Sequence, residues 1–303
     1  MGLLDQLVNV FLTVLTIGTG NLSAEAQFLL RIFIGIEIVT AAAFWFWAQE
    51  QIVSLLAFKV VRIGLFGLFV LQWLFLTSLF RDSMLWVASQ IGGGVISVET
   101  FLSPSALASS GYVATEPIWK WLQNTTGASA IWNIGTTILF VIALHGIWLA
   151  YQLTAINMSI CLIIFQFLAA FLLIFIAFGV FTGTSFLAER AFGGIIASSI
   201  RMGLVAACVS LAYPIVQFFV LPDPNAGIDP SLRQAFTLMA AVWAMFLISL
   251  VVPSIGATLF EGGPVFSGWG LIGGGFRGAA TSSRVAFGTA DMIITGISNL
   301  KKP

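Results

Sequence analysis

One stretch of the sequence carries no charge over an unusual length, and it constrains the fold more than any other feature. From Trp121 to Ala188 there is no Asp, Glu, Lys or Arg, and His145 is the only histidine. A helix needs about 20 apolar residues to cross the hydrocarbon core of a bilayer. The stretch is too long for one span and suits two. No water-soluble fold needs such a segment, so the chain is expected to reside in a membrane.

A polar interruption divides this stretch into two apolar arms. Gln152, Thr154 and Asn157 break the aliphatic pattern near its middle. A buried or lipid-facing helix is expected to be apolar all round, so a cluster of polar residues favours a turn. We therefore predict a transmembrane helical hairpin whose arms are residues 130–151 and 157–181.

The composition of the whole chain agrees with membrane residence. The sequence is 59% hydrophobic and 8% charged, whereas a typical soluble domain is about 25% charged. Lys plus Arg equal Asp plus Glu at 12 each, so no basic field attracts nucleic acid and no sequence-specific nucleic-acid binding is expected. Cys161 and Cys208 lie in apolar runs and suit small packing residues. The predicted fold class is an all-α polytopic membrane helical bundle.

The N-terminal segment, residues 1–27, has the pattern of an amphipathic helix. Asp5, Asn9, Thr13 and Thr16 recur at helical spacing and form a narrow polar stripe. The segment lacks the basic region and cleavage site of a secretory signal. We expect an uncleaved helix that lies in the interface or against the bundle, ending at the polar residues 18–23.

Further apolar segments follow, which bring the expected number of transmembrane helices to five or six. Besides the two hairpin arms they are 28–48, 63–80, 202–221 and 234–256, and Pro214 is expected to kink or interrupt the third of these. The chain then divides into an N-terminal helix and loop, two spans, a long extramembrane loop, a cluster of spans and a Gly-rich basic tail, with the bounds 1–27, 28–81, 82–129, 130–260 and 261–303.

The long loop 82–129 is the most promising place for a partner to dock. Residues from Thr115 to Leu122 predict a short helix with Pro117 in its first turn. Trp119 and Trp121 would rest on the membrane surface, where tryptophan is enriched. The alternative is an ordered loop that only covers the bundle.

The charges leave two topologies open. Six spans put both termini on one side, and the basic residues of the tail then favour cytoplasmic termini. If the segment containing Pro214 fails to span, the N-terminus lies outside and the tail inside. The first 27 residues contain no Lys or Arg, which makes them easy to translocate.

Three intramembrane polar residues were considered as sites. Glu37 falls near the middle of the first predicted span, where a charged carboxyl is costly. It is either a proton or cation site, or one partner of a pair with Arg31 of a neighbouring subunit, Lys59 or His145. We favour the pair, because a single carboxyl without a second acidic group makes a poor relay. His145 is expected to be buried and hydrogen-bonded.

No catalytic, cofactor or metal site is predicted. One histidine cannot supply a zinc site or a hydrolase triad. The glycines of 268–273 match a dinucleotide-binding pattern, but no strand precedes them. Gly179 and Gly183, like Ser199 and Gly203, have a spacing that permits close helix approach and are candidates for contacts between subunits.

Two local sequences carry a resemblance to a known family. They are Phe181-Thr-Gly-Thr-Ser-Phe-Leu-Ala-Glu189-Arg190-Ala-Phe-Gly-Gly-Ile-Ile196 and Val252-Pro-Ser-Ile-Gly-Ala-Thr-Leu-Phe-Glu-Gly-Gly-Pro264. Together with the order of the segments, they resemble the TrbL-like inner-membrane subunit of conjugative type IV secretion systems. The interface candidates Glu189 and Arg190 lie in the first of these motifs.

The resemblance implies a structural role rather than catalysis. It implies a multi-pass protein of the bacterial inner membrane that forms part of a channel and assembly platform for DNA or protein transfer and pilus growth. Implied partners are membrane lipid, secretion ATPases, other inner-membrane and periplasmic subunits, the pilin, and further copies in a cyclic homo-oligomer, for example a pentamer. Relatives are described with five spans, an outward N-terminus and a periplasmic central loop. The alternative function is a secondary transporter or ion-coupled permease that uses Glu37.

Overall fold

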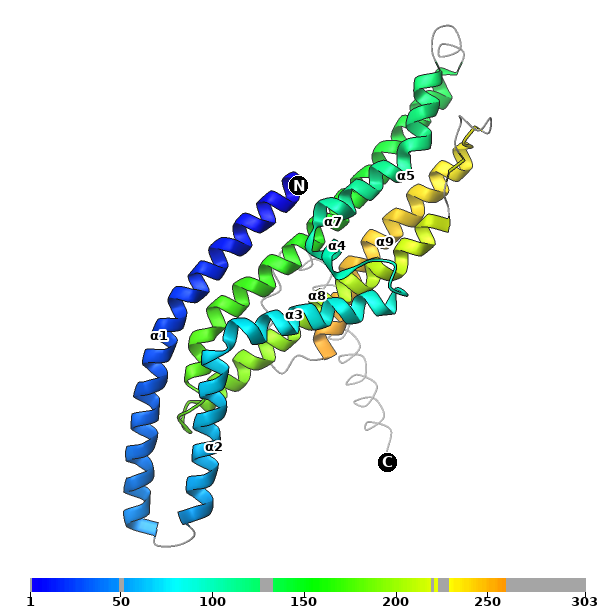
Figure 1. Cartoon of the computed structure of the whole chain (residues 1–303). Helices are drawn as coiled ribbons and strands as arrows, with labels where there is room; N and C mark the ends of the chain where they lie inside the picture. The colour runs from blue at the N-terminus through cyan, green and yellow to red at the C-terminus, as the bar shows by residue number, and fades with distance from the viewer. Residues whose placement is uncertain (1, 49–51, 126–132, 219–220, 223–228, 260–303) are drawn as a thin grey trace, which may run out of the picture. The chain divides into compact units, whose positions relative to one another are not determined.

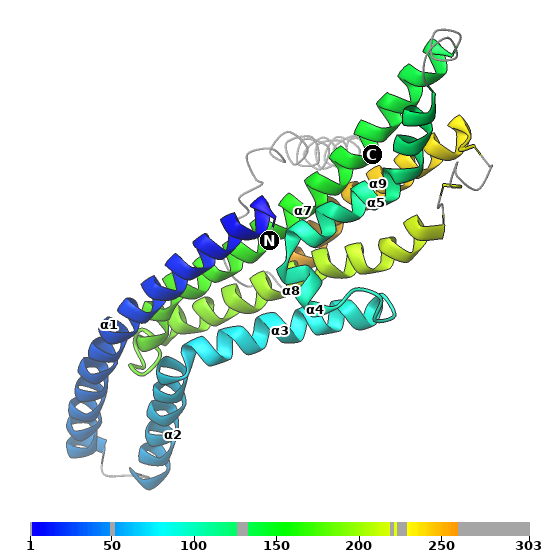
Figure 2. The ribbon, with the colours of Figure 1, turned by 45° about the horizontal axis from the view of Figure 1, so that its top comes forward.

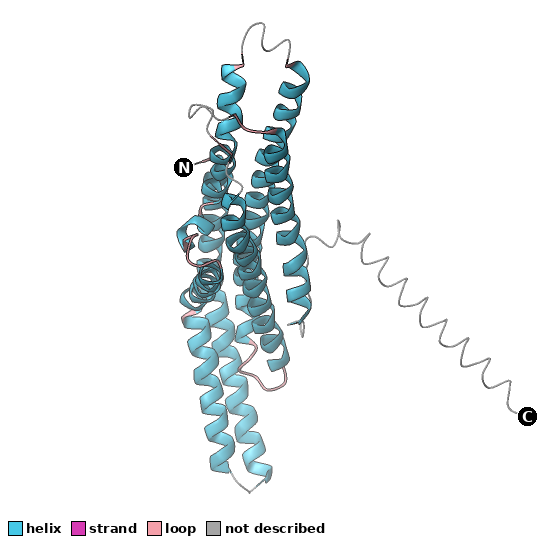
Figure 3. Cartoon of the chain, turned by 90° about the vertical axis from the view of Figure 1, so that its right-hand side faces the viewer, coloured by secondary structure: helices cyan, strands magenta, loops and turns pink. Residues whose placement is uncertain are grey.

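The computed structural model describes residues 2–48, 52–125, 133–218, 221–222 and 229–259, and these residues form an all-helical bundle (Figure 1). No strand occurs among them (Figure 3). The predicted all-α membrane bundle is confirmed. The helices are α1 (Leu3–Ala48), α2 (Ile52–Leu71), α3 (Trp73–Ile91), α4 (Val98–Leu102), α5 (Pro104–Asn124), α7 (Ile134–Ala177), α8 (Ser185–Phe218) and α9 (Leu232–Leu259). The predicted tail, 261–303, lies outside the described residues.

The helix α7 is the centre of the bundle. It packs against α1, α5, α8 and α9, and both hydrophobic core clusters contain its residues. One cluster joins its C-terminal half to α1, α2, α3 and α8, and the other joins its N-terminal half to α5 and α9. In Figures 1 and 2, α1 runs beside α7 and α3 runs beside α8.

The predicted hairpin is wrong, because α7 is one continuous helix through the polar interruption. Residues 152–157 contain no Gly or Pro, so nothing in their backbone preference ends a helix. The Thr154 hydroxyl donates to the Ala150 carbonyl at 2.8 Å. The amide of Asn157 donates to the backbone oxygen of Ser249 on α9 at 3.2 Å. Thr154 is therefore satisfied within its own helix, and Asn157 joins α7 to α9 instead of forming a turn.

The helix α1 likewise runs without the break expected at residues 18–23, so the N-terminal helix and the first predicted span are one element. The Thr19 hydroxyl donates to the Leu15 carbonyl at 2.7 Å, which satisfies it inside the helix. At its start, α1 is tied to α5. The Asp5 carboxylate accepts from the Ser105 N–H at 2.8 Å, and the Ser105 hydroxyl accepts from the Asp5 N–H at 3.1 Å. Each residue thereby caps the helix of the other.

The second predicted span corresponds to a bent pair of helices. Residues 57–71 of α2 and 73–91 of α3 meet at an angle of 75°, visible in Figure 1 where α3 turns away from α2. The indole N–H of Trp73 donates to the Ala169 carbonyl of α7 at 2.7 Å. A buried tryptophan needs such a partner for its N–H, so this bond fixes the start of α3 on the central helix.

The predicted long loop is largely helical. Residues 82–129 contain the end of α3, all of α4 and all of α5. The helix in this region begins at Pro104 rather than near Thr115, and Pro117 lies in its interior. A Cβ added to Gly111 would stand 2.9 Å from the Cβ of Tyr151 on α7, so the small residue lets α5 approach α7 closely. This packing matches the interpretation that the segment covers the bundle.

The last two described helices reproduce the predicted apolar segments with longer bounds. The helix α8 continues through Pro214, so the proline does not interrupt it, and α9 begins at Leu232. Gly203 of α8 faces Met84 on α3. A Cβ added to Gly203 would stand 3.1 Å from the Cβ of Met84. The small residue at 203 therefore serves a contact within the chain.

Four of the described helices are long and apolar enough to cross a membrane, and the bent pair of α2 and α3 makes a fifth if it is one span. The six apolar segments of the sequence become five because the two hairpin arms are one helix. At about 1.5 Å per residue, the 44 residues of α7 are about 66 Å long, which is about twice the thickness of the hydrocarbon core. Part of α7 therefore extends beyond the bilayer.

Candidate functional site

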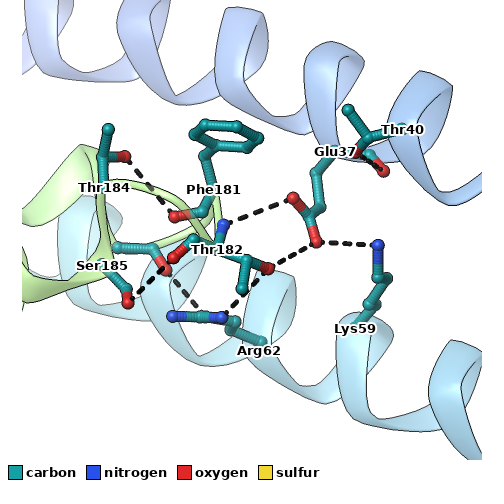
Figure 4. A network of polar contacts seen from close by, with 9 residues as sticks. Glu37, Thr40, Lys59, Arg62, Phe181, Thr182, Thr184 and Ser185 are labelled. Atoms are coloured by element: carbon teal, nitrogen blue, oxygen red, sulfur yellow. Dashed lines mark hydrogen bonds and ion pairs between the residues drawn. The ribbon is translucent and has the colours of Figure 1, made fainter.

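The polar site that joins the most elements lies where α1, α2 and the turn between α7 and α8 meet (Figure 4). Glu37 of α1 is 2% exposed. Its Oε1 lies 3.1 Å from the Nζ of Lys59 on α2 and accepts a hydrogen bond from the Thr182 hydroxyl at 2.9 Å. Its Oε2 accepts from the Thr182 backbone N–H at 3.3 Å. Burying a carboxylate carries a desolvation penalty, which the ion pair and these hydrogen bonds offset.

Arg62 extends the network from α2 to the turn. Its Nε donates to the Gly179 carbonyl at 2.9 Å, and its Nη1 donates to the Thr182 hydroxyl oxygen at 3.3 Å. The Thr182 hydroxyl thus accepts from Arg62 while it donates to Glu37. Within this group the charges are one carboxylate and two cations, so the site has a net positive charge.

The turn is also held by aromatic contacts and by its own hydroxyl groups. The ring of Phe33 on α1 lies 4.6 Å from that of Phe178 and 6.5 Å from that of Phe181, measured between centroids. The Thr184 hydroxyl donates to the Phe178 carbonyl at 2.9 Å. The Ser185 hydroxyl donates to the Thr182 carbonyl at 3.3 Å. These contacts give the turn one defined conformation against α1.

The chemistry of this site is that of a structural clasp. Both carboxylate oxygens of Glu37 have partners within the chain, and Lys59 is the partner among the three considered from the sequence. Glu37 thus contacts the turn that joins α7 to α8. No group of three or more His, Cys, Asp or Glu that could hold a metal occurs among the described residues.

The other intramembrane candidates are not brought together with Glu37. Arg31 is exposed on α1, and no ion pair or hydrogen bond joins it to another described residue. His145 is exposed on α7, so the expectation of a buried histidine is wrong. Its Nδ1 lies 2.8 Å from the Val141 carbonyl of its own helix. It is hydrogen-bonded as expected, but at the surface.

The interface candidates lie at three separate places. Trp119 is exposed on α5, whereas Trp121 packs on Phe140 of α7 with ring centroids 4.5 Å apart. Glu189 and Arg190 are exposed near the start of α8, and the guanidinium of Arg190 lies 5.8 Å from the centroid of the Phe186 ring.

Gly179 and Gly183 do not form a helix-packing motif, because both lie in the turn between α7 and α8. A Cβ on Gly179 would collide with the ring of Phe66 on α2. The small residue therefore serves a close contact within the chain at the clasp.

Thr182 and Arg62 are the members of the clasp that were not singled out as site residues from the sequence. One local signal was present, since the Thr182-Gly-Thr184 break follows a long apolar run. The pairing itself was hidden, because the contacts of Thr182 with Glu37 and Arg62 span 145 and 120 residues of sequence.

The described helices and their clasp define a multi-pass membrane protein whose buried polar groups join helices to one another. A family model described as TrbL/VirB6 plasmid conjugal transfer protein matches residues 34–255, which is more than half of the chain. The chain belongs to this family, and is thus a component of a conjugal transfer, or type IV secretion, system that acts with other subunits. The family is a structural component of conjugation and is not a known enzyme family. Curated proteins and solved structures gave no match.

Proposed function

We propose that the protein is a structural channel and scaffold subunit of the secretion system, located in the bacterial inner membrane and working as a cyclic homo-oligomer. In this role it supports passage of DNA or protein and assembly of the pilus, together with the secretion ATPases, other envelope subunits and the pilin. The family supports membership of the machine. The channel and scaffold role is supported by polar residues that are exposed along one side of α1.

The observation that carries this proposal is an exposed polar stripe on α1. Asn9, Thr13, Thr16, Gly20 and Arg31 are all exposed and recur at helical spacing. They lie away from the side of α1 that is buried against the bundle, which includes Val8, Thr19 and Ala26.

Among the described residues the stripe has almost no hydrogen-bond partners outside its own helix. Asn9, Thr13 and Arg31 bond to no other described residue, and the Thr16 hydroxyl donates only to the Leu12 carbonyl of its own helix. A polar group that faces lipid without a partner is costly. A stripe that faces further copies or a water-filled path avoids that cost, and small residues such as Gly20 let helices approach closely.

Site-directed cross-linking tests this arrangement. The two native cysteines are buried, so single cysteines introduced by N9C, T13C and T16C report on the stripe. V10C and V14C are matched controls, because Val10 and Val14 are also exposed on α1, at 63% and 61%, but off the stripe. In membranes, short bis-maleimides are expected to give cross-linked oligomers from the three stripe positions and little from the two controls. Equal cross-linking at all five positions would contradict an oligomer organised on the stripe.

Function is measured in parallel by DNA transfer from a donor strain that lacks the gene and carries each variant. Purification in mild detergent is expected to yield a symmetric assembly or envelope partners. A strictly monomeric particle that moves a solute by itself in proteoliposomes would contradict the proposal and favour the transporter alternative. No contact of Glu37 favours that alternative, since its carboxylate is held by Lys59 and Thr182. E37Q should therefore leave DNA transfer intact wherever the variant assembles.

A further inference from the structure

A groove between α5 and α7 has a chemistry that the channel and scaffold role does not use. Its volume is about 410 Å³, and its lining includes Tyr112, Thr115, Glu116 and Trp119 of α5 and His145 and Trp148 of α7. The groove belongs to the part of the bundle where α5 covers the N-terminal half of α7. It is distinct from the clasp around Glu37.

Aromatic rings form much of this lining. The rings of Tyr112 and Trp148 have centroids 5.6 Å apart and are tilted by 55°, and Trp119 is 54% exposed. The face of an aromatic ring attracts a cation, and tryptophan is the best of the aromatic residues for this. Three such rings around one groove therefore favour a positively charged ligand with apolar surface.

Three side chains of the lining offer acceptors to the same charge, whereas the buried Nε1–H of Trp148 is a donor with no hydrogen-bond partner among the described residues. Glu116 brings a carboxylate, and the lining contains no Lys or Arg. The Nδ1 of His145 lies 2.8 Å from the Val141 carbonyl. A neutral imidazole that donates there has its Nε2 free as an acceptor. The Thr115 hydroxyl donates to the Gly111 carbonyl at 2.8 Å and keeps its oxygen as an acceptor.

Glu116 has a cation of its own nearby, the Nζ of Lys120 at 3.1 Å. Both side chains are partly or fully exposed, at 56% for Glu116 and 30% for Lys120. Exposed pairs one helical turn apart are worth only a few tenths of a kcal/mol. A ligand cation that is held by the aromatic rings as well can therefore share or replace this contact.

We propose that the groove binds the ammonium headgroup of a zwitterionic phospholipid, phosphatidylethanolamine being the probe of choice. The groove supplies ring faces and acceptors for the ammonium. Exposed apolar residues on the same two helices, Val113, Val141 and Leu149, offer a surface for the acyl chains. Tryptophan such as Trp119 is enriched at the depth of the headgroups. This site selects a lipid by its cation and needs no other subunit.

Lipid titration followed by native mass spectrometry of the full-length protein in detergent tests the proposal. Phosphatidylethanolamine is compared with phosphatidylglycerol, which lacks the ammonium, for the native chain, W119A and E116Q. W86A is the matched control, because Trp86 is 58% exposed on α3 and lies away from the groove. We expect W119A to weaken phosphatidylethanolamine binding about threefold, in line with the loss of one exposed cation–π contact. E116Q should weaken it by a smaller factor, and W86A should leave it unchanged.

The outcomes separate a specific site from general lipid contact. Equal binding of the two lipids by the native chain, or equal weakening in W86A and W119A, would overturn the proposal. Competition by free ethanolamine without selective lipid binding would identify a soluble ammonium as the ligand and would overturn the lipid assignment. Unfolding temperatures accompany each titration. Since Trp119 and Glu116 are exposed, both variants are expected to fold. If W119A does not fold, unchanged selectivity for phosphatidylethanolamine in E116Q would still overturn the proposal.

Discussion

Glu37 illustrates how distant parts of the chain decide the chemistry of a residue that the sequence singles out. The sequence left open a proton site and a structural pair. In the structure the carboxylate is bound by Lys59 and by two groups of Thr182. With every carboxylate oxygen engaged and the side chain buried, the residue is built to hold α1, α2 and the turn together.

The ion pair at the clasp should show energetic coupling. In E37Q the single amide oxygen can accept from only one of the two Thr182 donors, and the charge that pairs with Lys59 is lost, so we expect a loss of about 1–2 kcal/mol. K59M leaves the buried carboxylate without its cation and should cost more, about 3 kcal/mol. The double variant E37Q/K59M should be less destabilised than the sum of the two.

Thermal unfolding in detergent measures these three variants together. Neighbouring groups in one network have interaction energies of about 0.5–3 kcal/mol. If the free-energy losses of the two single variants simply added in the double variant, Lys59 and Glu37 would not be energetically coupled, which would contradict the ion pair's role in stability.

Gly179 gives a second test at the same site. A Cβ at this position collides with the ring of Phe66, and overpacking a tight contact costs about 1–3 kcal/mol. G179A should therefore lower the unfolding temperature. G35A is the control: Gly35 is exposed within α1, and an added Cβ has nothing within 4 Å. Alanine in a helix interior is favoured over glycine by about 0.5–1 kcal/mol, so G35A should be neutral or stabilising. A loss in G35A equal to that in G179A would contradict the collision.

At the scale of elements, the main surprise is the unbroken length of α1 and α7. In both helices the sequence predicts an interruption at polar residues, and in neither does a turn form there. The hydroxyls of Thr19 and Thr154 bond to carbonyls of their own helix, and Asn157 bonds to α9. A polar residue in a membrane helix is costly only while it lacks a partner, so its presence alone does not predict where a helix ends.

A distance measurement separates one long helix from a hairpin. Leu139 and Phe171 are both exposed on α7, and spin labels at L139C and F171C, in a chain with Cys161 and Cys208 replaced by alanine, report the distance between them. A continuous helix places these positions about 48 Å apart, at about 1.5 Å per residue. In the hairpin they would lie on adjacent arms, at about the 8–10 Å that separates packed helices. Pulsed electron paramagnetic resonance distinguishes the two values, and a short distance would contradict the single helix.

At the scale of the whole molecule, the number of spans sets the sides on which the termini lie. Four helices qualify among the described residues, and the bent α2–α3 pair is the fifth candidate. One topology assumed that the segment containing Pro214 fails to span the membrane. The number of apolar segments instead falls from six to five because the two predicted hairpin arms are one helix, α7. If the bent pair crosses the membrane, the N-terminus and the chain after α9 lie on opposite sides.

We predict an outward N-terminus and a cytoplasmic C-terminal tail, which agrees with the absence of Lys and Arg in the first 27 residues and the basic residues of the tail. Fusions of alkaline phosphatase and a fluorescent protein to each end test this, because the first is active only outside and the second only inside. Activity of the same reporter at both ends would show that the α2–α3 pair re-enters the same side. Reporter fusions after Ala177, in the turn that holds Gly179, provide an internal reference point.

Several residues show how far sequence reasoning reaches at the sites. Trp119 and Trp121 were placed together on the membrane surface, yet Trp121 packs on Phe140 while Trp119 stays exposed. Gly179 was considered for contacts between subunits and serves one within the chain. In each case the residue type was informative, but its neighbour lies in another helix, and helical periodicity carries no information about that helix.

The sequence by itself determined that this is an all-helical, multi-pass membrane protein, because hydropathy and helix length are properties of contiguous residues. Its motifs also carried the family. Only the tertiary structure decided that the charge-free stretch after Trp121 holds one long central helix rather than a hairpin, and that Glu37 is bound to Lys59 and Thr182. Those outcomes depend on which polar groups meet across the bundle. A buried polar side chain has to find its partner wherever the packed helices bring one within reach.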